Sequence, residues 1–209
     1  MKKLVLPLLM CLSLMAYSQF TDDFSDGDFT NDPPWVGNHH KFIVDDGVLQ
    51  LYDDAAGTSY LATESHMVHF TQWEFWVRLA FTPSDNNHAR IYLVSDGSEL
   101  DKPLNGYFLQ IGKTGGDNKR LYFYRQDGEA VEELMAGSMN LATATNNILR
   151  IRVTRDGFGN WEFQADPAGG NILIPQGEAF DNKHTSTSWF GLKCTYTVSN
   201  SKRFYLDDL

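Results

Sequence analysis

The chain has almost no cysteine. Only two of its 209 residues are cysteines, and one of them, Cys11, lies in an apolar N-terminal segment. If that segment is removed on export, Cys194 is the only thiol left and no intrachain disulfide can form. A secreted domain of this kind must depend on its hydrophobic core, because it lacks the cross-links that stabilise small disulfide-rich proteins.

Long apolar runs are absent after residue 18. The first residues read MKKLVLPLLMCLSLMAYS, with two lysines ahead of an apolar run and small residues near its end. This pattern predicts a secretory signal peptide over residues 1–18, cleaved after Ser18. Lipidation of Cys11 is the alternative, but Met10 stands where a lipoprotein peptidase needs a small residue. We therefore expect export to the cell surface or beyond, and no membrane insertion of the mature chain.

Basic residues are also few. The chain has 17 Lys and Arg against 27 Asp and Glu, a formal net charge of −10. Removal of the signal peptide leaves 15 basic residues against 27 acidic ones and a net charge of −12. Such a surface repels nucleic acid and anionic lipid, which argues against either as a partner. The remaining chain of roughly 190 residues fits one domain, and its aromatic content is too high for a disordered segment.

Helical periodicity is nearly absent, and apolar residues instead alternate with polar ones. Alternation of period two indicates strands. The clearest candidates lie at residues 41–53, 72–82, 88–96, 105–112, 119–128, 148–166, 189–199 and 203–208, with a short strand at 171–175. Turn-forming Gly, Asn and Asp residues occur between or within them at 45–47, 95–97, 114–118, 126–128 and 155–160. Antiparallel strands without interleaved helices predict an all-β sandwich or barrel. No repeat or linker divides residues 19–209, so we expect a single domain.

The mature chain opens on an acidic stretch, TDDFSDGDF, at residues 21–29. It is no helix-flanked calcium loop, because Phe24 occupies the position of the second ligand. We expect a first strand with Phe24 inward, beside the closing RFYLDDL. Two acidic ends in contact would repel one another unless a cation or backbone donors relieve them. One hypothesis is a structural calcium ion; the alternative is that the carboxylates face water. The candidate calcium ligands are Asp22, Asp23, Asp26 and Asp207.

Several segments, taken in order, resemble a known family. They are DDFSDGDF near the start, WEFWVRLAFTPSDNNHARIYLVSD, PLNGYFLQIG, LRIRVTRDGFGNWEFQADPAGG and the closing FGLKCTYTVSNSKRFYLDD. Nearly the whole mature chain resembles the concanavalin A-like (laminin G-like) jelly-roll module of secreted multidomain bacterial proteins, often found ahead of a lamin-tail domain. The resemblance implies two packed antiparallel sheets, and in the expected jelly roll the N- and C-terminal strands are adjacent. It also implies a concave face that meets sugar in related lectins and glucanases, and no catalytic activity.

No catalytic motif is present. Related retaining glucanases resemble one another in a Glu-x-Asp-x-x-Glu strand that aims two carboxylates into one cleft, and this chain has no such stretch. Glu74 and Glu162 are isolated, and we expect both on the outward side of half-buried strands. Cys194 alternates with apolar residues, which predicts a buried small hydrophobe. The spacing of the histidines argues against a transition-metal site. We therefore expect a protein without enzymatic activity.

Aromatic and arginine residues alternate along several predicted strands. Flat rings stack on sugar rings while polar side chains bind hydroxyl groups. If these polar faces are contiguous, they form a surface suited to a neutral or acidic glycan. The alternative for each residue is that the rings complete the core or pack beneath a loop and the arginines pair with acidic neighbours. The candidate ligand-binding residues are Trp76, Arg78, Arg90, Tyr92, Gln110, Tyr122, Tyr124, Arg150 and Arg152.

Three function classes follow from this reading. The first is a secreted, non-catalytic module that recognises a polysaccharide or glycoprotein, which predicts an exposed aromatic ring on a concave sheet. The second is a structural or adhesive spacer of a larger cell-surface protein, which predicts that all large rings are buried. The third and weakest is a glycoside hydrolase, which predicts two carboxylates roughly 5 to 10 Å apart across a cleft.

Overall fold

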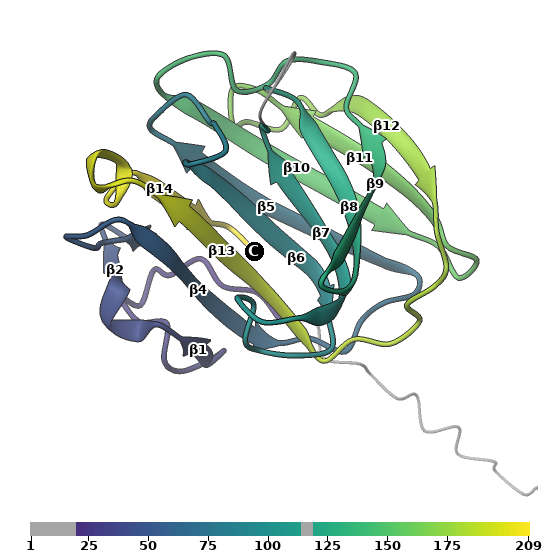
Figure 1. Cartoon of the computed structure of the whole chain (residues 1–209), viewed down its shortest axis with the longest axis horizontal. Coiled ribbons are helices and arrows are strands. Elements are labelled where there is room, and N and C mark those ends of the chain that lie inside the picture. The colour runs from purple at the N-terminus through teal and green to yellow at the C-terminus, as the bar shows by residue number, and fades with distance from the viewer. Residues whose placement is uncertain (1–19, 114–118) are drawn as a thin grey trace, which may run out of the picture.

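The computed structural model describes residues 20–113 and 119–209, which form a sandwich of two β-sheets (Figure 1). This part of the chain contains strands, two short 3-10 helices, η1 (His39–Lys41) and η2 (Val198–Asn200), and no α-helix. None of its helices is long and apolar enough to cross a membrane. The predicted signal peptide with Cys11 and the turn at 114–118 lie outside the described residues.

Each sheet has seven strands, and neighbouring strands within each sheet pair antiparallel. In spatial order the first sheet contains β1 (Trp35–Gly37), β4 (Gly57–Glu64), β13 (Trp189–Tyr196), β6 (His88–Ser95), β7 (Leu104–Ile111), β8 (Leu121–Gly128) and β9 (Ala130–Ala136). The second contains β12 (Ile174–Phe180), β11 (Asn160–Asp166), β10 (Asn147–Arg155), β5 (Thr71–Leu79), β14 (Phe204–Asp207), β3 (Val48–Leu51) and β2 (Phe42–Asp45). Strands distant in the chain are neighbours, because the chain crosses repeatedly between the layers. The predicted two-sheet jelly roll is confirmed.

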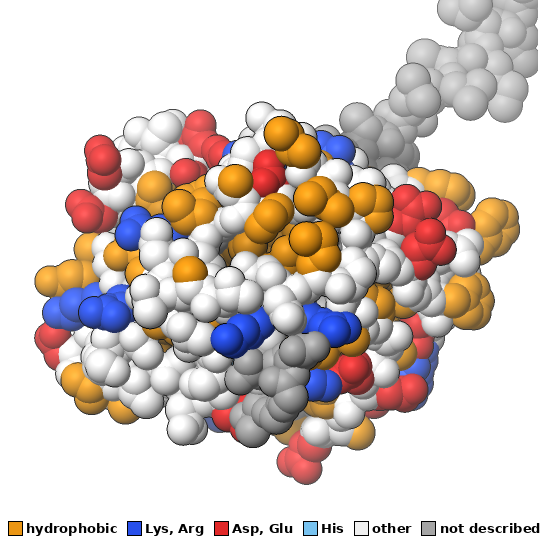
Figure 2. All heavy atoms as spheres, turned by 90° about the horizontal axis from the view of Figure 1, so that it is seen from above, with side chains coloured by type: hydrophobic (Ala, Val, Ile, Leu, Met, Phe, Trp, Pro, Cys, Tyr) orange, Lys and Arg blue, Asp and Glu red, His pale blue; other side chains and the backbone are white. Residues whose placement is uncertain are grey.

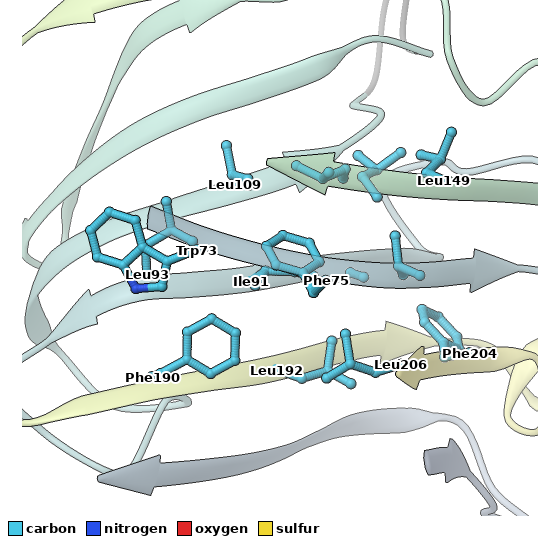
Figure 3. Packing of buried hydrophobic residues seen from close by; sticks show 14 of the residues in the cluster. Trp73, Phe75, Ile91, Leu93, Leu109, Leu149, Phe190, Leu192, Phe204 and Leu206 are labelled. Carbon is cyan, nitrogen blue, oxygen red and sulfur yellow. The ribbon is translucent and has the colours of Figure 1, made fainter. Parts of the chain in front are cut away.

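The main core lies between the sheets, where alternate residues of each strand point inward (Figure 3). The buried residues of β5 are Trp73, Phe75, Val77 and Leu79. Glu74 and Trp76, which stand between them, are partly exposed. Strands β6 and β13 supply apolar residues from the opposite sheet, including Cys194. Burial raises the pKa of the Cys194 thiol, so this residue is the inert small hydrophobe that its spacing predicts.

A second, smaller hydrophobic cluster lies on the outer side of the first sheet. Its buried members are Ala62, Tyr92, Leu100, Leu104 and Phe108. Tyr92 and Phe108 alternate along β6 and β7 with residues of the main core, so they point away from it. Leu100 comes from the β6–β7 connection, and its carbonyl oxygen accepts a hydrogen bond of 2.9 Å from Lys193 Nζ. This connection therefore covers part of the outer face.

Asp22, near the start of the described chain, meets the C-terminal residue, but the first and last strands, β1 and β14, belong to different sheets and are not the adjacent pair that was predicted. Asp22 and Leu209 exchange two backbone hydrogen bonds of 3.1 and 2.9 Å. Phe24 points inward and is fully buried. The acidic stretch around it is not the expected strand, however, because its own side chains fold the backbone into turns. In each turn a carboxylate accepts the backbone N–H two residues ahead; the four acceptors are Asp22, Asp23, Asp26 and Asp28.

The strand predictions hold where alternation is strong and fail where it is weak. Strand β4 was not predicted, since its inward residues include Ser59 and Thr63. Strand β9 is an edge strand with mostly exposed residues and was also missed. The short strand expected at 171–175 begins only at Ile174, because the Asp166 carboxylate accepts the N–H groups of Ala168 and Ile172 and holds the preceding segment as a turn.

Candidate functional site

The structure separates the nine predicted ligand residues onto two faces. Five lie on β6, β7 and β8 of the first sheet: Arg90, Tyr92, Gln110, Tyr122 and Tyr124. Four lie on β5 and β10 of the second sheet: Trp76, Arg78, Arg150 and Arg152. Both groups point away from the core between the sheets, so they face opposite sides of the sandwich. The idea of one contiguous surface is wrong, because the successive strands β5 and β6 belong to different sheets.

On the outer face of the second sheet, Arg150 and Arg152 are paired with carboxylates, whereas Arg78 donates to the Asn146 side chain. Arg152 Nε lies 2.8 Å from Glu74 Oε2, and Arg150 Nη1 lies 3.6 Å from Glu74 Oε1. Arg150 also pairs with Asp208. The indole of Trp76 lies under a loop, where a Cβ added to Gly169 would stand 2.8 Å from Nε1. These contacts match the alternative in which the arginines pair with acidic neighbours.

The outer face of the first sheet carries rings and cations, and we call it the aromatic face. It consists of Tyr60, Arg90, Tyr92, Phe108, Gln110, Tyr122, Tyr124 and Trp189. Arg90 lies 4.6 Å from the centroid of the Phe108 ring, and its Nε donates a hydrogen bond of 2.9 Å to Gln110 Oε1. Tyr124 stacks on Phe108 at 5.0 Å. Phe108 thus lies at the centre of the five predicted residues of this sheet. The sequence analysis did not name Phe108, although its alternation with Gln110 along β7 indicates that it points to the same face.

Much of the aromatic face is closed to a ligand. Tyr92, Tyr122 and Gln110 are 0%, 4% and 6% exposed. The Tyr92 hydroxyl donates a hydrogen bond of 2.9 Å to Gln126, and Lys113 lies over the Tyr122 ring. Arg90 and Tyr124 remain partly exposed. The accessible part is therefore smaller than the sequence predicts.

A polar pocket of about 710 Å³ opens at one end of the first sheet. Its lining residues are Asp96, Asn105, Asp127, Gly128, Lys183, His184, Thr185 and Ser186. Gln126 connects it to the aromatic face, because its amide accepts the Tyr92 hydroxyl and donates to the Gly128 carbonyl at 2.8 Å. Sequence reasoning missed this pocket, since its residues come from two connections and from the ends of β7 and β8, which only the fold brings together.

The polar groups of the pocket divide into fixed and available ones. The Asp96 carboxylate accepts hydrogen bonds of 2.8 Å from the backbone N–H and the side-chain amide of Asn105. By contrast, Thr185 and Ser186 are exposed, and within the described part of the chain no hydrogen bond uses their hydroxyl groups. Lys183 is more than half exposed and lies 2.9 Å from Asp127. The pocket thus presents hydroxyl, amide, ammonium and carboxylate groups within one small volume.

A buried polar network anchors the segment that carries these hydroxyl groups. The Tyr107 hydroxyl donates to Asp181 and accepts a hydrogen bond of 3.0 Å from the His184 backbone N–H. Arg125 pairs with both Asp181 and Asp127. Burial by itself would raise the pKa of Asp127, but hydrogen bonds from Lys183 and Arg125 lower it below the usual value. Burial and the bond to Asp181 raise the pKa of Tyr107, so its hydroxyl stays protonated.

The acidic residues proposed for calcium do not fit a metal site. Asp22 Oδ2 accepts a hydrogen bond of 2.8 Å from Trp35 Nε1, and Oδ1 accepts the Phe24 N–H. Asp23 Oδ1 and Asp26 Oδ1 each accept a backbone N–H group as well. Burial and then the neighbouring carboxylates raise the pKa of Asp207 to about 6. In the two described ranges, no group of three or more His, Cys, Asp or Glu could hold a metal ion.

The carboxylates considered for catalysis are open to solvent or paired. Glu74 is held by two arginines. Glu162 lies on the outward side of β11, as predicted, and its direct cross-strand neighbour is Glu178. Both glutamates are exposed to solvent.

Several solved structures have a fold similar to this sandwich. The carbohydrate recognition domain of Emp47p has a TM-score of 0.63 at 12% identity over 90% of this chain and 91% of that one. The carbohydrate-binding module CBM66 from Bacillus subtilis has a TM-score of 0.56 at 11% identity over 83% of this chain and 91% of its own. The exoplasmic/lumenal domain of VIP36 has a TM-score of 0.59 at 12% identity over 83% and 80%.

The two-sheet architecture is similar to that of these carbohydrate-binding domains. No family model and no curated protein sequence matches the chain. Forms of VIP36 with Ca²⁺ and mannose, and a potassium-bound form of the Emp46p domain, are among the similar structures. At identities of 11 to 12% these likenesses establish the architecture. The concanavalin A-like part of the predicted resemblance agrees with them, and the laminin G-like and lamin-tail part stays a prediction.

Proposed function

We propose that the protein is a secreted, non-catalytic module that binds a carbohydrate in the polar pocket, with the adjoining aromatic face as a secondary contact. The observation that carries the proposal is the set of free hydroxyl groups of Thr185 and Ser186 beside Lys183 and Asn105 in one pocket. Sugars are recognised by closely placed donors and acceptors of this kind. The lectin-like architecture supports the same ligand class.

The binding energy would come from hydrogen bonds and from one partly exposed ring. A pyranose in the pocket could accept from Lys183 and exchange hydrogen bonds with the two hydroxyl groups. A longer glycan could extend along the first sheet toward Tyr124, whose ring is stacked on Phe108 and held rigid. A rigid ring binds sugar at low entropic cost. The partner is thus a polysaccharide or the glycan of a glycoprotein.

Absence of catalysis is part of the proposal. It is supported by the exposure of Glu162 and Glu178, the cross-strand carboxylate pair of β11 and β12. A glycosidase instead holds its two catalytic carboxyl groups on either side of a cleft that encloses the sugar. Incubation with any bound glycan should therefore release no shorter product.

The test is a glycan array on the mature domain, with the Lys183→Ala and Ser186→Ala variants. We expect binding by the parent domain and a loss of about tenfold in each variant, because each removes one hydrogen-bonding group from the ligand. Lys102→Ala is the matched control, since Lys102 is exposed and does not line the pocket. A chelator arm should leave binding unchanged; loss of binding there would reveal a required cation. Equal binding by all variants would refute the pocket.

A structural or adhesive spacer is the second candidate function. The observation that favours it is the burial of Tyr92 and Tyr122, because a spacer needs no exposed rings. If a well-folded parent domain binds no glycan on the array, the carbohydrate-binding proposal is wrong and the spacer takes its place.

A further inference from the structure

A second cavity, also of about 710 Å³, lies at the other end of β13 from the polar pocket. The polar pocket uses residues just before β13, whereas this cavity uses residues of the β13–β14 connection (Figure 1). We call it the basic pocket. Its lining residues are Asp53, Asp54, Arg78, Ala80, Thr145, Asn146, Val198, Ser199, Ser201, Lys202, Arg203 and Tyr205.

Positive charge exceeds negative charge in the basic pocket, although the chain as a whole is acidic. Its cations are Arg78, Lys202 and Arg203. Asp53 is already bound by Lys41 Nζ at 2.6 Å and by the Tyr196 hydroxyl, outside the cavity lining. Asp54 lies 2.7 Å from Lys202, but its side chain is 91% exposed, so this pair is weak.

Neither arginine of the pocket has a carboxylate partner within the described residues. Arg203 is exposed, and the Arg78 side chain pairs with an amide rather than an acid. The arginines on the neighbouring strand β10, Arg150 and Arg152, do pair with carboxylates. The chain has 27 acidic residues, yet among the described residues these two arginines have no carboxylate partner, so all their guanidinium donors except Arg78 Nε are left for a ligand.

The Arg78 guanidinium is held in place before any ligand binds. Its Nε donates a hydrogen bond of 2.8 Å to Asn146 Oδ1, and its Cζ lies 5.0 Å from the centroid of the Tyr205 ring. The Tyr205 hydroxyl lies 3.3 Å from both the Lys202 carbonyl oxygen and Gln50 Nε2. A fixed guanidinium beside a ring suits a ligand that has a negative group on an apolar body.

We propose that the basic pocket binds the carboxylate or sulfate ester of an acidic carbohydrate through Arg78 and Arg203. The inference rests on the proposed carbohydrate-binding function for its ligand class, but it concerns a different cavity. A planar carboxylate or a sulfate oxygen pair accepts two hydrogen bonds from one guanidinium. Lys202 adds a third positive charge, held 4.0 Å above the Tyr52 ring.

The experiment is calorimetric titration of the mature domain with three carbohydrates: oligogalacturonate, sulfated dextran and uncharged dextran. We expect at least one anionic probe to bind in the basic pocket. Uncharged dextran should not bind there. Arg78→Gln and Arg203→Gln should each weaken anionic binding about tenfold or more, because each removes a charge-assisted hydrogen bond. Comparing oligogalacturonate with sulfated dextran identifies the acidic group.

Arg152→Gln is the matched control, since Arg152 lies on the same sheet and is bound to Glu74. Arg203 is exposed, so its variant should fold even if Arg78→Gln does not. Anionic binding that is unchanged in the Arg203 variant, or equally weakened in the Arg152 variant, overturns the proposal. If neutral glycans bind the polar pocket and no anionic probe binds, the basic site is wrong and the proposed function stands. If anionic probes bind and depend on Arg78 and Arg203, while no neutral glycan binds on the array, the polar pocket is wrong instead.

Discussion

At the scale of single residues, buried polar groups position the candidate sites. Arg155 is 2% exposed and lies against the Tyr107 and Trp161 rings, while its Nη2 donates a hydrogen bond of 3.0 Å to Asn182. Burial lowers the pKa of Arg155, although nearby Tyr107 and Asp181 oppose this effect. These side chains tie the β12–β13 connection to the core. The free hydroxyl groups of the polar pocket therefore stand on a fixed backbone.

Tyr107→Phe should destabilise the protein by about 1 to 3 kcal/mol. The change leaves the Asp181 carboxylate and the His184 backbone N–H each without the partner that Tyr107 provides. The measurement is the free energy of unfolding in urea. Tyr60→Phe is the control, because no hydrogen bond among the described residues uses the Tyr60 hydroxyl. Equal stability of both variants would show that the Tyr107 bonds contribute nothing net.

At the scale of elements, the first sheet depends on close backbone approach at one bulge. The register between β6 and β7 shifts between Tyr92 and Val94, and Gly106 stands opposite Ser95 beside this shift. A Cβ added to Gly106 would lie 1.9 Å from the Val94 carbonyl oxygen. The bulge lies near the end of β6, just before Asp96, and a bulge redirects the strand that follows it. It therefore helps to position Asp96, which lines the polar pocket.

Gly106→Ala should cost about 2 to 4 kcal/mol of unfolding free energy, because backbone atoms must move to admit the methyl group. Gly97→Ala is the matched control: Gly97 follows the same strand, and an added Cβ there meets nothing within 4 Å. Thermal and urea unfolding of the two variants measure the difference. A loss of similar size in both would contradict the role of close approach at Gly106.

At the scale of the whole molecule, charge and apolar surface are unevenly distributed. The face in Figure 2 carries hydrophobic side chains near its middle and separate groups of acidic and basic side chains around them. Asp22 and Leu209 meet beside Asp207 and Asp208, and repulsion there is relieved by backbone hydrogen bonds and by Arg150. Closure of the sandwich therefore brings negative charges together, and the pKa of Asp207 is raised as a result.

Asp207→Asn should stabilise the protein at pH 8, by on the order of 1 kcal/mol, and change little at pH 4. The pKa of Asp207 is raised to about 6, chiefly by burial and then by Asp208 and Asp23. A raised folded-state pKa favours folding below pH 4, and this contribution is lost as the pH rises through 6. Urea unfolding at pH 4, 6 and 8 measures it, with the exposed Asp45→Asn as control. A pH-independent difference would contradict the assignment.

The sequence by itself determined the elements and much of the fold class. Alternation along β5, β6, β10 and β13 predicts strands and their inward faces, because side chains of a strand point to opposite sides in turn. The buried Cys194 follows from the same rule. The acidic opening was predicted as a strand and is a series of turns, because local carboxylate-to-backbone bonds compete with strand pairing.

Only the tertiary structure decided which outward faces lie together. Alternation says that Trp76 and Tyr92 point outward, but not that β5 and β6 belong to different sheets. The polar and basic pockets draw on connections separated by many residues, and no local pattern marks Ser186 with Asn105 or Arg78 with Arg203. Local sequence controls the direction of a side chain, whereas strand order and chain crossing control its neighbours.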